Sequence, residues 1–465
     1  MTVQSKMTNA VLCTCQDFQH PWTDKCVNAS AGLLFAATPY CLRVYSMVYL
    51  LSMIMRHKIP SLQDLRKMVM GILQSTAFLV TNAYTFIMFN CLLRNMLGQY
   101  YFSTVAFWPC FLGSLSAIVV ERPQRRPLLA LYVANVATET LWNMAETRGW
   151  VKSLPNGQVL LFGASISILL YLYRLGLHKT SCRDSLFDIL RIFVGKPEEG
   201  PLKPVEIDEN NVDEPPAASR SRPPVNLNTI NGWVQVYSRL VETMKGKHKS
   251  CPHRGSCVHG AVMGGLKPML GGIGLQVALK LLLNVKRIAQ NKMNWKKTIF
   301  NKQTLNLGLF LGSFSFLYKS VSCGLRHIFN RDDPRFAIPA GLIGSIGFAY
   351  YPDVTVALYV MWKMLQVVYN LGIDKKKLPH IPGFTMFLYA FCTAVLFHAG
   401  ILEAKNLRQS YFKFLQDISG GRLSKFDMAP LDVYGLNSSQ SKADVLRRLN
   451  IVEKSPFPAF PLDKW

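Results

Sequence analysis

Uncharged, largely apolar runs alternate with short basic segments along the whole chain. Five runs of 17 to 26 residues contain no Asp, Glu, Lys or Arg, and they cover positions 68–93, 95–120, 153–173, 336–352 and 378–402. The hydrocarbon core of a bilayer, about 30 Å thick, requires roughly 20 apolar residues in a helix. The pattern therefore predicts five membrane-spanning helices.

Three further apolar runs each hold one ionisable residue. They are 128–145 with Glu139, 303–325 with Lys319 and 354–373 with Lys363. A charge at the centre of a membrane helix costs roughly 2.5–3.5 kcal/mol, so we expect these groups to face a cavity or each other. A functional pathway, a structural ion pair and side chains that extend to the interface all fit this pattern. Counting these runs, we predict about eight spans.

Two apolar stretches are interrupted more strongly. Positions 31–55 contain Pro39 and Arg43, and positions 263–285 contain Lys267, Pro268 and Lys280. Their composition predicts segments that lie along the membrane interface.

The second half of the chain repeats the first. Cys91-Leu92-Leu93-Arg94 recurs as Cys323-Gly324-Leu325-Arg326, and Ala130-Leu131-Tyr132-Val133 recurs as Ala357-Leu358-Tyr359-Val360. The amphipathic pattern Ser185, Phe187, Leu190, Gly195 returns with identical spacing as Ser410, Phe412, Leu415, Gly420. Collinear matches of this kind indicate a tandem duplication. Four spans in each copy, an even number, would keep both copies in one orientation.

The predicted fold is thus an all-α polytopic membrane protein, a tandem duplication of a four-helix transmembrane unit with a disordered central linker. The predicted segments are 1–67 (Cys-containing, with an interfacial stretch), 68–195 (first unit plus an amphipathic helix), 196–260 (linker, basic helix and Cys/His segment), 261–302 (second interfacial stretch and basic loop), 303–420 (second unit plus an amphipathic helix) and 421–465 (cytosolic tail).

Composition supports a membrane protein. Half the residues are hydrophobic and 17% are charged, against about 25% in ordinary globular proteins, yet Lys+Arg minus Asp+Glu is 52 − 27 = +25. A nucleic-acid binder would spread this surplus over a folded surface, whereas here it collects between apolar runs, so we expect no nucleic-acid partner. The positive-inside rule predicts that both termini, the linker and the face with Arg66 are cytosolic, with Arg94 and Arg326 on the opposite face.

The linker is set apart by its composition. Positions 196–224 hold seven Pro, seven acidic and four basic residues, too little apolar surface to fold. Positions 232–249 then predict a short basic helix, suited to anionic lipid, to a partner groove or to packing on its own domain.

Small residues recur at four-residue spacing inside the later spans. They are Gly308 with Gly312, Ala340 with Gly344, and Gly341 with Ser345. Such spacing lets helices approach closely, and it predicts packing within the chain or, alternatively, a pore or dimer face.

Two Cys/His groups are candidate metal sites. Cys251, His253, Cys257 and His259 fall within nine residues, and Cys13, Cys15, His20 and Cys26 lie near the N-terminus. Zinc accepts four such ligands tetrahedrally, while free thiols and surface histidines are the alternative. No Walker loop, His-Glu-x-x-His or Gly-x-Ser-x-Gly motif is present, so we expect no enzyme and no cofactor.

Several motifs resemble the transmembrane protein 135 family, also called peroxisomal membrane protein 52, over nearly the whole chain. They are His20-Pro21-x4-Cys26, Ala134-Asn135-x-Ala137-Thr138-Glu139-Thr140-Leu141, Asn156-Gly157-x-Val159-Leu160-Leu161-Phe162, Leu190-Arg191-x-Phe193-Val194-Gly195-Lys196, Leu311-Gly312-Ser313-Phe314 and Leu431-Asp432-Val433-Tyr434-Gly435. The resemblance implies residence in mitochondrial and peroxisomal membranes. It also implies a role in the fusion-fission balance, through a dynamin-related fission GTPase, with links to peroxisome organisation and fatty-acid metabolism.

The second half is also similar to channel subunits of the mitochondrial inner-membrane import translocase. The similarity spans some forty residues and includes Gly308, Gly312, Arg326, Asp332, Ala340, Gly341 and Gly344. The first half lacks the acidic pair Asp332-Asp333. The similarity of the second half makes a translocase-like channel or a transporter of lipid-related metabolites the alternative function.

Overall fold

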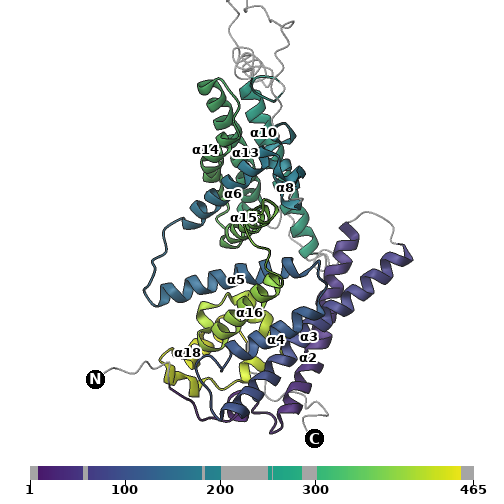
Figure 1. The fold of residues 1–465 in the computed structure, drawn as a ribbon, viewed down its shortest axis with the longest axis vertical. Helices are drawn as coiled ribbons and strands as arrows, with labels where there is room; N and C mark the ends of the chain where they lie inside the picture. Colours follow the sequence, from purple (N-terminus) through teal and green to yellow (C-terminus); the bar gives the residue numbers. More distant parts are fainter. Residues whose placement is uncertain are drawn as a thin grey trace, which may run out of the picture. The chain divides into compact units, whose positions relative to one another are not determined.

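The computed structural model describes residues 9–55, 61–180, 184–200, 250–253, 255–284 and 301–451. These residues form helices joined by turns, with one isolated bridge between Val11 and Tyr100 (Figure 1). No β-strand occurs in these ranges. The predicted all-α fold is confirmed.

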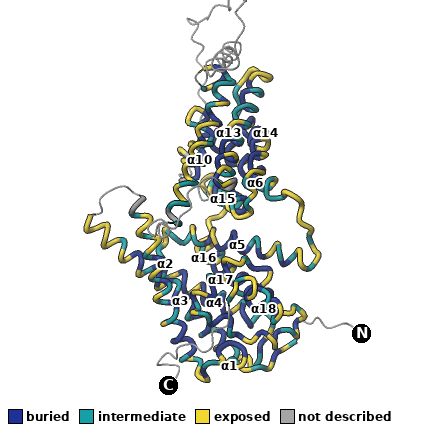
Figure 2. The backbone as a smooth tube through the Cα atoms, turned by 180° about the vertical axis from the view of Figure 1, so that it is seen from behind, coloured by how far each residue is buried: buried dark blue, intermediate teal, exposed yellow. Residues whose placement is uncertain are grey.

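Six of the described helices are long and apolar enough to cross a membrane. They are α2 (Cys26–Met55), α3 (Leu62–Leu97), α6 (Gly157–Leu175), α10 (Cys257–Leu283), α15 (Val354–Asp374) and α16 (Phe384–Leu402). Large apolar side chains are exposed along them, such as Met47 and Val48 on α2 and Leu270 and Leu275 on α10. Figure 2 shows how much of α2 and α3 beside their grey connection is exposed. Lipid accommodates such surfaces and water does not, so the protein is a multi-pass membrane protein.

Two predicted spans have different bounds. The run 95–120 is divided, because α3 ends at Gly98, whose φ of 71° closes the helix in a left-handed conformation, and α4 (Phe107–Val120) starts after a turn. Glycine adopts this conformation without steric cost. The run 336–352 consists of η3 (Pro334–Phe336), α14 (Ala337–Gly344) and the 3-10 helix η4 (Ser345–Tyr350).

The two stretches predicted to lie along the interface instead form α2 and α10, which continue through Pro39 and Pro268. Helix α2 runs antiparallel to α3, and α10 runs antiparallel to α13 (Lys302–Phe329), where Lys280 Nζ lies 2.5 Å from Thr304 Oγ1. Each copy therefore has five helical segments rather than four, the fourth being α5 (Arg126–Thr147) in the first copy and α15 in the second. The prediction that both copies have the same orientation depended on an even number of spans in each copy. An odd number of segments does not support that prediction.

The chain forms two compact units that differ from its sequential halves. One unit is Met1–Ser153 with Ile381–Trp465, and the other is Leu154–His380. In the first unit α16 packs against α4 and α5, and in the second unit α6 packs against α14 and α15. The fifth helix of each copy therefore completes the unit built by the first four helices of the other copy. We call this arrangement the helix exchange.

The amphipathic helices follow the same exchange. Helix α8 (Ser185–Val194), preceded by the short α7 (Leu177–Thr180), packs against α10 and α13, and α17 (Gln409–Ile418) packs against α2.

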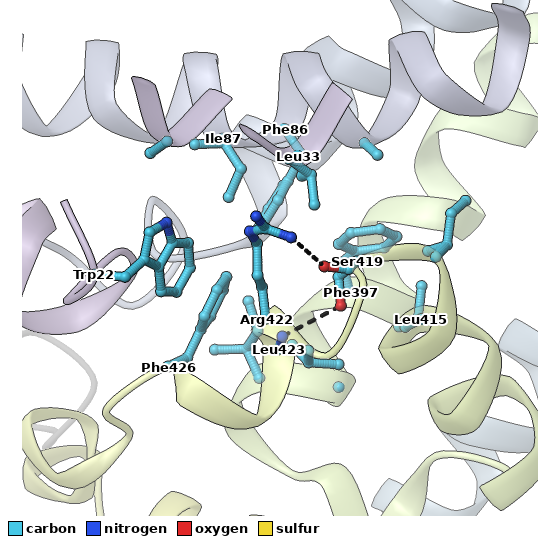
Figure 3. A pocket seen from close by; sticks show the side chains of 15 residues that line it. Trp22, Leu33, Phe86, Ile87, Phe397, Leu415, Ser419, Arg422, Leu423 and Phe426 are labelled. Atoms are coloured by element: carbon cyan, nitrogen blue, oxygen red, sulfur yellow. Dashed lines mark hydrogen bonds between the residues drawn. The ribbon is translucent and has the colours of Figure 1, made fainter. Parts of the chain in front are cut away.

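A small apolar cavity of about 50 Å³ marks the place where α16 and α17 meet α2 and α3 (Figure 3). Arg422, at the start of η6 (Arg422–Lys425), is buried there. Its guanidinium lies 5.7 Å from the centre of the Trp22 ring and donates to the Ser419 carbonyl at 3.4 Å. The long stem of the arginine thus fills space that the apolar side chains leave open.

Two segments predicted to lie outside the bundles are folded. The predicted tail contains η6, η7 (Ala429–Tyr434) and α18 (Ser438–Arg448), and it buries Leu431, Tyr434 and Val445. The short η5 (Ala404–Asn406) connects α16 to α17. The predicted disordered linker begins with η2 (Lys196–Glu198), in which Glu198 is buried because arginines surround it. The rest of the linker, 201–249, including the predicted basic helix, lies outside the described residues.

Candidate metal centres

Three cysteines and one histidine converge at one end of the first unit. Cys15 begins α1 (Cys15–Phe18), His20 follows that helix, Cys26 is the first residue of α2, and Cys91 lies near the end of α3. The four candidate ligand atoms all lie within 4.8 Å of one another. Cys15 Sγ is 3.4 Å from Cys26 Sγ, and Cys91 Sγ is 3.5 Å from His20 Nε2. We call these four residues the first cluster.

Local structure explains how these residues meet. Helix α1 begins with a capping box, in which the Asp17 N–H donates to Thr14 Oγ1 at 3.1 Å and the Thr14 N–H donates to Asp17. Because α2 and α3 are antiparallel, the start of α2 and the end of α3 lie together. The segment before α2 then supplies two ligands and the helix pair supplies the other two.

A hydrogen bond orients the histidine of the first cluster. His20 is fully buried, and its Nδ1 lies 2.8 Å from the Thr23 carbonyl oxygen. A carbonyl oxygen only accepts, so Nδ1 carries the proton and Nε2 presents its lone pair to the thiols. This is the tautomer that a metal ligand requires.

An equivalent group, the second cluster, occurs in the second unit. It consists of Cys251, His253, Cys257 at the start of α10, and Cys323 near the end of α13, again with all ligand atoms within 4.8 Å. Cys251 Sγ lies 3.6 Å from Cys257 Sγ and 3.9 Å from Cys323 Sγ. His253 Nε2 lies 3.3 Å from Cys323 Sγ, while its buried Nδ1 has no hydrogen-bond partner among the described residues.

In each cluster the surroundings favour the thiolate form of one cysteine. The hydrogen bond from the Cys91 thiol is the largest influence that lowers the pKa of Cys15 to about 4, although burial opposes the shift. In the second cluster hydrogen bonds from Cys323 and His253 lower the pKa of Cys251 to about 4, again against burial. The thiolate is the form that ligates metals.

The clusters differ from the predicted sets by one residue each. Cys13 is outside the first cluster, and its carbonyl accepts a hydrogen bond from Arg94 Nε at 2.9 Å. His259 is outside the second cluster, and its N–H donates to Ser256 Oγ at 3.2 Å. Cys91 and Cys323 take their places. Their equivalent positions in the repeat were the sequence signal, but ligands more than 60 residues away are not visible as a short motif.

The clusters also correct the predicted membrane faces. Residues 15–26 lie at the Arg94 end of α3, because Cys91 is in the first cluster, and not at the Arg66 end. Likewise residues 251–257 lie at the Arg326 end of α13. Interfacial stretches would have left the preceding segments on the predicted face. Because α2 and α10 instead run the length of their partner helices, these segments lie on the opposite membrane face.

The ionisable residues of the spans do not face each other. Glu139 on α5 pairs with Arg408, and Lys363 on α15 pairs with Asp184 at 2.7 Å. Lys319 on α13 lies beside Gly264, where a Cβ would come within 2.3 Å of its Nζ. Glycine at 264 therefore makes room for the lysine side chain.

A buried ionic network lies at the same end of the second unit as the second cluster. The Arg326 guanidinium donates to both Glu198 carboxylate oxygens at 2.9 and 2.6 Å, and its Nε donates to Asp332 at 2.9 Å. Arg174 pairs with Asp332 and lies 3.7 Å from Glu198. Both arginines are fully buried. The negative charges of Glu198 and Asp332 compensate their two positive charges, as buried charges require.

The small residues make close contacts within the second unit. Gly308 and Gly312 on α13 lie against Met269 of α10, and Gly341 on α14 lies against Ser167 of α6. Gly344 faces Phe314, and Ala340 is fully buried.

These features define a multi-pass, all-α membrane protein with a duplicated bundle and one Cys/His cluster in each unit. Residues 13–146 match the family described as the N-terminal cysteine-rich region of Transmembrane protein 135. This region, less than a third of the chain, is similar to the transmembrane protein 135 family. All four residues of the first cluster lie inside the matched region. No solved structure matches the chain.

Proposed function

We propose that this protein is a non-enzymatic regulator of organelle dynamics in mitochondrial and peroxisomal membranes. It acts on the balance of fusion and fission through a dynamin-related fission GTPase, with consequences for peroxisome organisation and fatty-acid metabolism. The family match over residues 13–146 is the observation that carries this proposal. The motifs outside that region that resemble the same family support it.

In this proposal a soluble partner binds the segment 201–249. The described residues on either side of 201–249 lie at the Arg326 end of α13 in the second unit, since Glu198 pairs with Arg326 and Cys251 lies beside Cys323. The segment therefore leaves and returns on one membrane face. Its composition, with acidic and Pro-rich positions followed by basic ones, suits contact with a soluble protein or a lipid surface. In this proposal that face is cytosolic.

A deletion tests partner recruitment. Residues 203–249 are removed, and 196–200 are kept because Glu198 belongs to the buried network. We expect the GTPase to be recruited less and mitochondria to elongate, while membrane insertion is unchanged. A chain with the 203–249 segment scrambled controls for length. Normal recruitment by the deletion variant would refute this part of the proposal.

Imaging tests the site of action. A tagged full chain is viewed beside mitochondrial and peroxisomal markers, in cells with and without the endogenous protein. We expect the tag on both organelles and altered organelle length on removal. Exclusive labelling of another membrane would contradict the proposal.

A transporter is the competing function. Glu139 and Lys363 pair with residues that immediately precede amphipathic helices, which gives them a structural role and favours the regulator. In proteoliposomes we expect no flux that Glu139→Gln or Lys363→Ala changes. A flux that either variant abolishes, with the fold intact, would favour transport instead.

A further inference from the structure

The distances within the two clusters are those of ligands around a tetrahedral metal ion. With Zn–S bonds of about 2.3 Å, two thiolates of a tetrahedron lie about 3.8 Å apart, and a thiolate and an imidazole nitrogen lie about 3.5 Å apart. Three S···S pairs lie 3.4 to 3.9 Å apart, two S···N pairs lie 3.5 and 3.3 Å apart, and every other pair in the clusters lies within 4.8 Å. Both clusters match this geometry.

The same distances exclude disulfides in this structure. A disulfide requires an S–S distance of about 2.05 Å. The described cysteines are free thiols.

The duplication provides independent support. Cys26 and Cys257 are the first residues of α2 and α10, and Cys91 and Cys323 occupy equivalent positions near the ends of α3 and α13. The same Cys₃His set thus recurs in each copy at the same end of the same helix pair. A chance meeting of three thiols and a histidine would not be expected twice in equivalent places.

The first cluster is also accessible and oriented. A cavity of about 570 Å³, lined by Cys15, Cys26, Cys91 and Arg94 among others, opens beside it and provides an entry path for an ion. The hydrogen bond from His20 Nδ1 to the Thr23 carbonyl supplies the supporting contact that metal-binding histidines usually have.

We propose that each cluster binds one zinc ion through three cysteine thiolates and one histidine Nε2. Cys15, His20, Cys26 and Cys91 hold the first ion, and Cys251, His253, Cys257 and Cys323 hold the second. All four tetrahedral positions are filled by protein ligands, which is the arrangement of structural zinc and not of catalytic zinc. Each ion joins the segment that precedes α2 or α10 to the C-terminal end of the next long helix, which is α3 or α13.

The direct test is the zinc content of the full chain, purified in lipid nanodiscs and measured by plasma mass spectrometry. We expect two zinc ions per chain, one in Cys91→Ser, one in Cys323→Ser and none in the double variant. Cys110→Ser and Cys392→Ser are matched controls, because both thiols are buried in α4 and α16 outside the clusters, and they retain two ions.

A second measurement keeps the test decisive where a serine variant does not fold. Cys91→His retains a ligand and is expected to keep two ions, while cobalt substitution of the wild type gives thiolate-to-cobalt charge-transfer absorption. Wild-type protein without metal whose cluster thiols are freely alkylated would overturn the proposal. Disulfides within the clusters, or bound iron with the absorption of an iron–sulfur cluster, would overturn it as well.

Discussion

Glu139 on α5 forms an ion pair with Arg408, the residue that immediately precedes α17. In the other unit Lys363 on α15 pairs with Asp184, the residue that caps the start of α8. The two pairs occupy corresponding places, within about one helical turn, but their charges are reversed. Had each copy kept its own fifth helix and amphipathic helix, Asp184 would approach Glu139 and Arg408 would approach Lys363. Like charges would then oppose each other, so the pairs favour the helix exchange.

Reversing one charge should therefore destabilise the first unit. Glu139→Lys places two cations together, and we expect a loss of roughly 1–3 kcal/mol, between the values for exposed and buried pairs. Thermal unfolding in nanodiscs measures the loss. The double variant Glu139→Arg with Arg408→Glu should recover most of it. Equal stability of the single and double variants would show that the pair does not contribute.

The ionic network in the second unit should be far more sensitive than a surface pair. Arg326→Ala leaves Glu198 and Asp332 buried with too little positive charge, and we expect a loss of roughly 3–5 kcal/mol. Arg447 provides the control, since its pair with Asp444 is largely exposed, and Arg447→Ala should cost less than about 0.5 kcal/mol. Denaturant unfolding of both variants makes the comparison, and similar losses would contradict the assigned burial.

Acid should destabilise the second unit through Glu198. Burial opposes its ionisation, but Arg326 and Arg174 outweigh burial and hold its pKa below the ordinary value. The unfolded chain, with a glutamate pKa of about 4.3, then binds the proton more readily than the folded one. The stabilisation is complete above that pH and is lost as the pH falls through the folded pKa. Unfolding temperatures between pH 7 and 3 should show this, and Glu198→Gln should flatten the profile.

Close packing of α10 on α13 predicts a clear contrast between two glycines. A Cβ on Gly308 would lie 2.7 Å from the Met269 carbonyl oxygen, so Gly308→Ala forces the helices apart and should cost roughly 1–3 kcal/mol. Gly271 on α10 has no atom within 4 Å of such a Cβ. Gly271→Ala should be neutral or stabilise by up to about 1 kcal/mol, since alanine favours helix. Thermal unfolding distinguishes the two, and equal effects would argue against this packing.

Hydrophobic periodicity predicted most of the helices, because the length of an apolar run directly reflects the thickness of the bilayer. It misjudged α2 and α10, whose internal Pro39, Arg43, Pro268 and Lys280 lower the apparent apolarity. Packing along α3 and α13 compensates for these interruptions, and Lys280 reaches Thr304. A single-sequence pattern does not contain that compensation.

The sequence by itself determined the all-α membrane character and the duplication, and it named six of the eight cluster residues as candidate ligands. Composition and local spacing carry that information. Only the tertiary structure decided that α6 and α16 are exchanged, that Cys91 and Cys323 complete the clusters, and that Glu139 meets Arg408 rather than another membrane charge. These contacts join positions from about 60 to 270 residues apart, and long-range pairing depends on how whole helices pack, which no local pattern records.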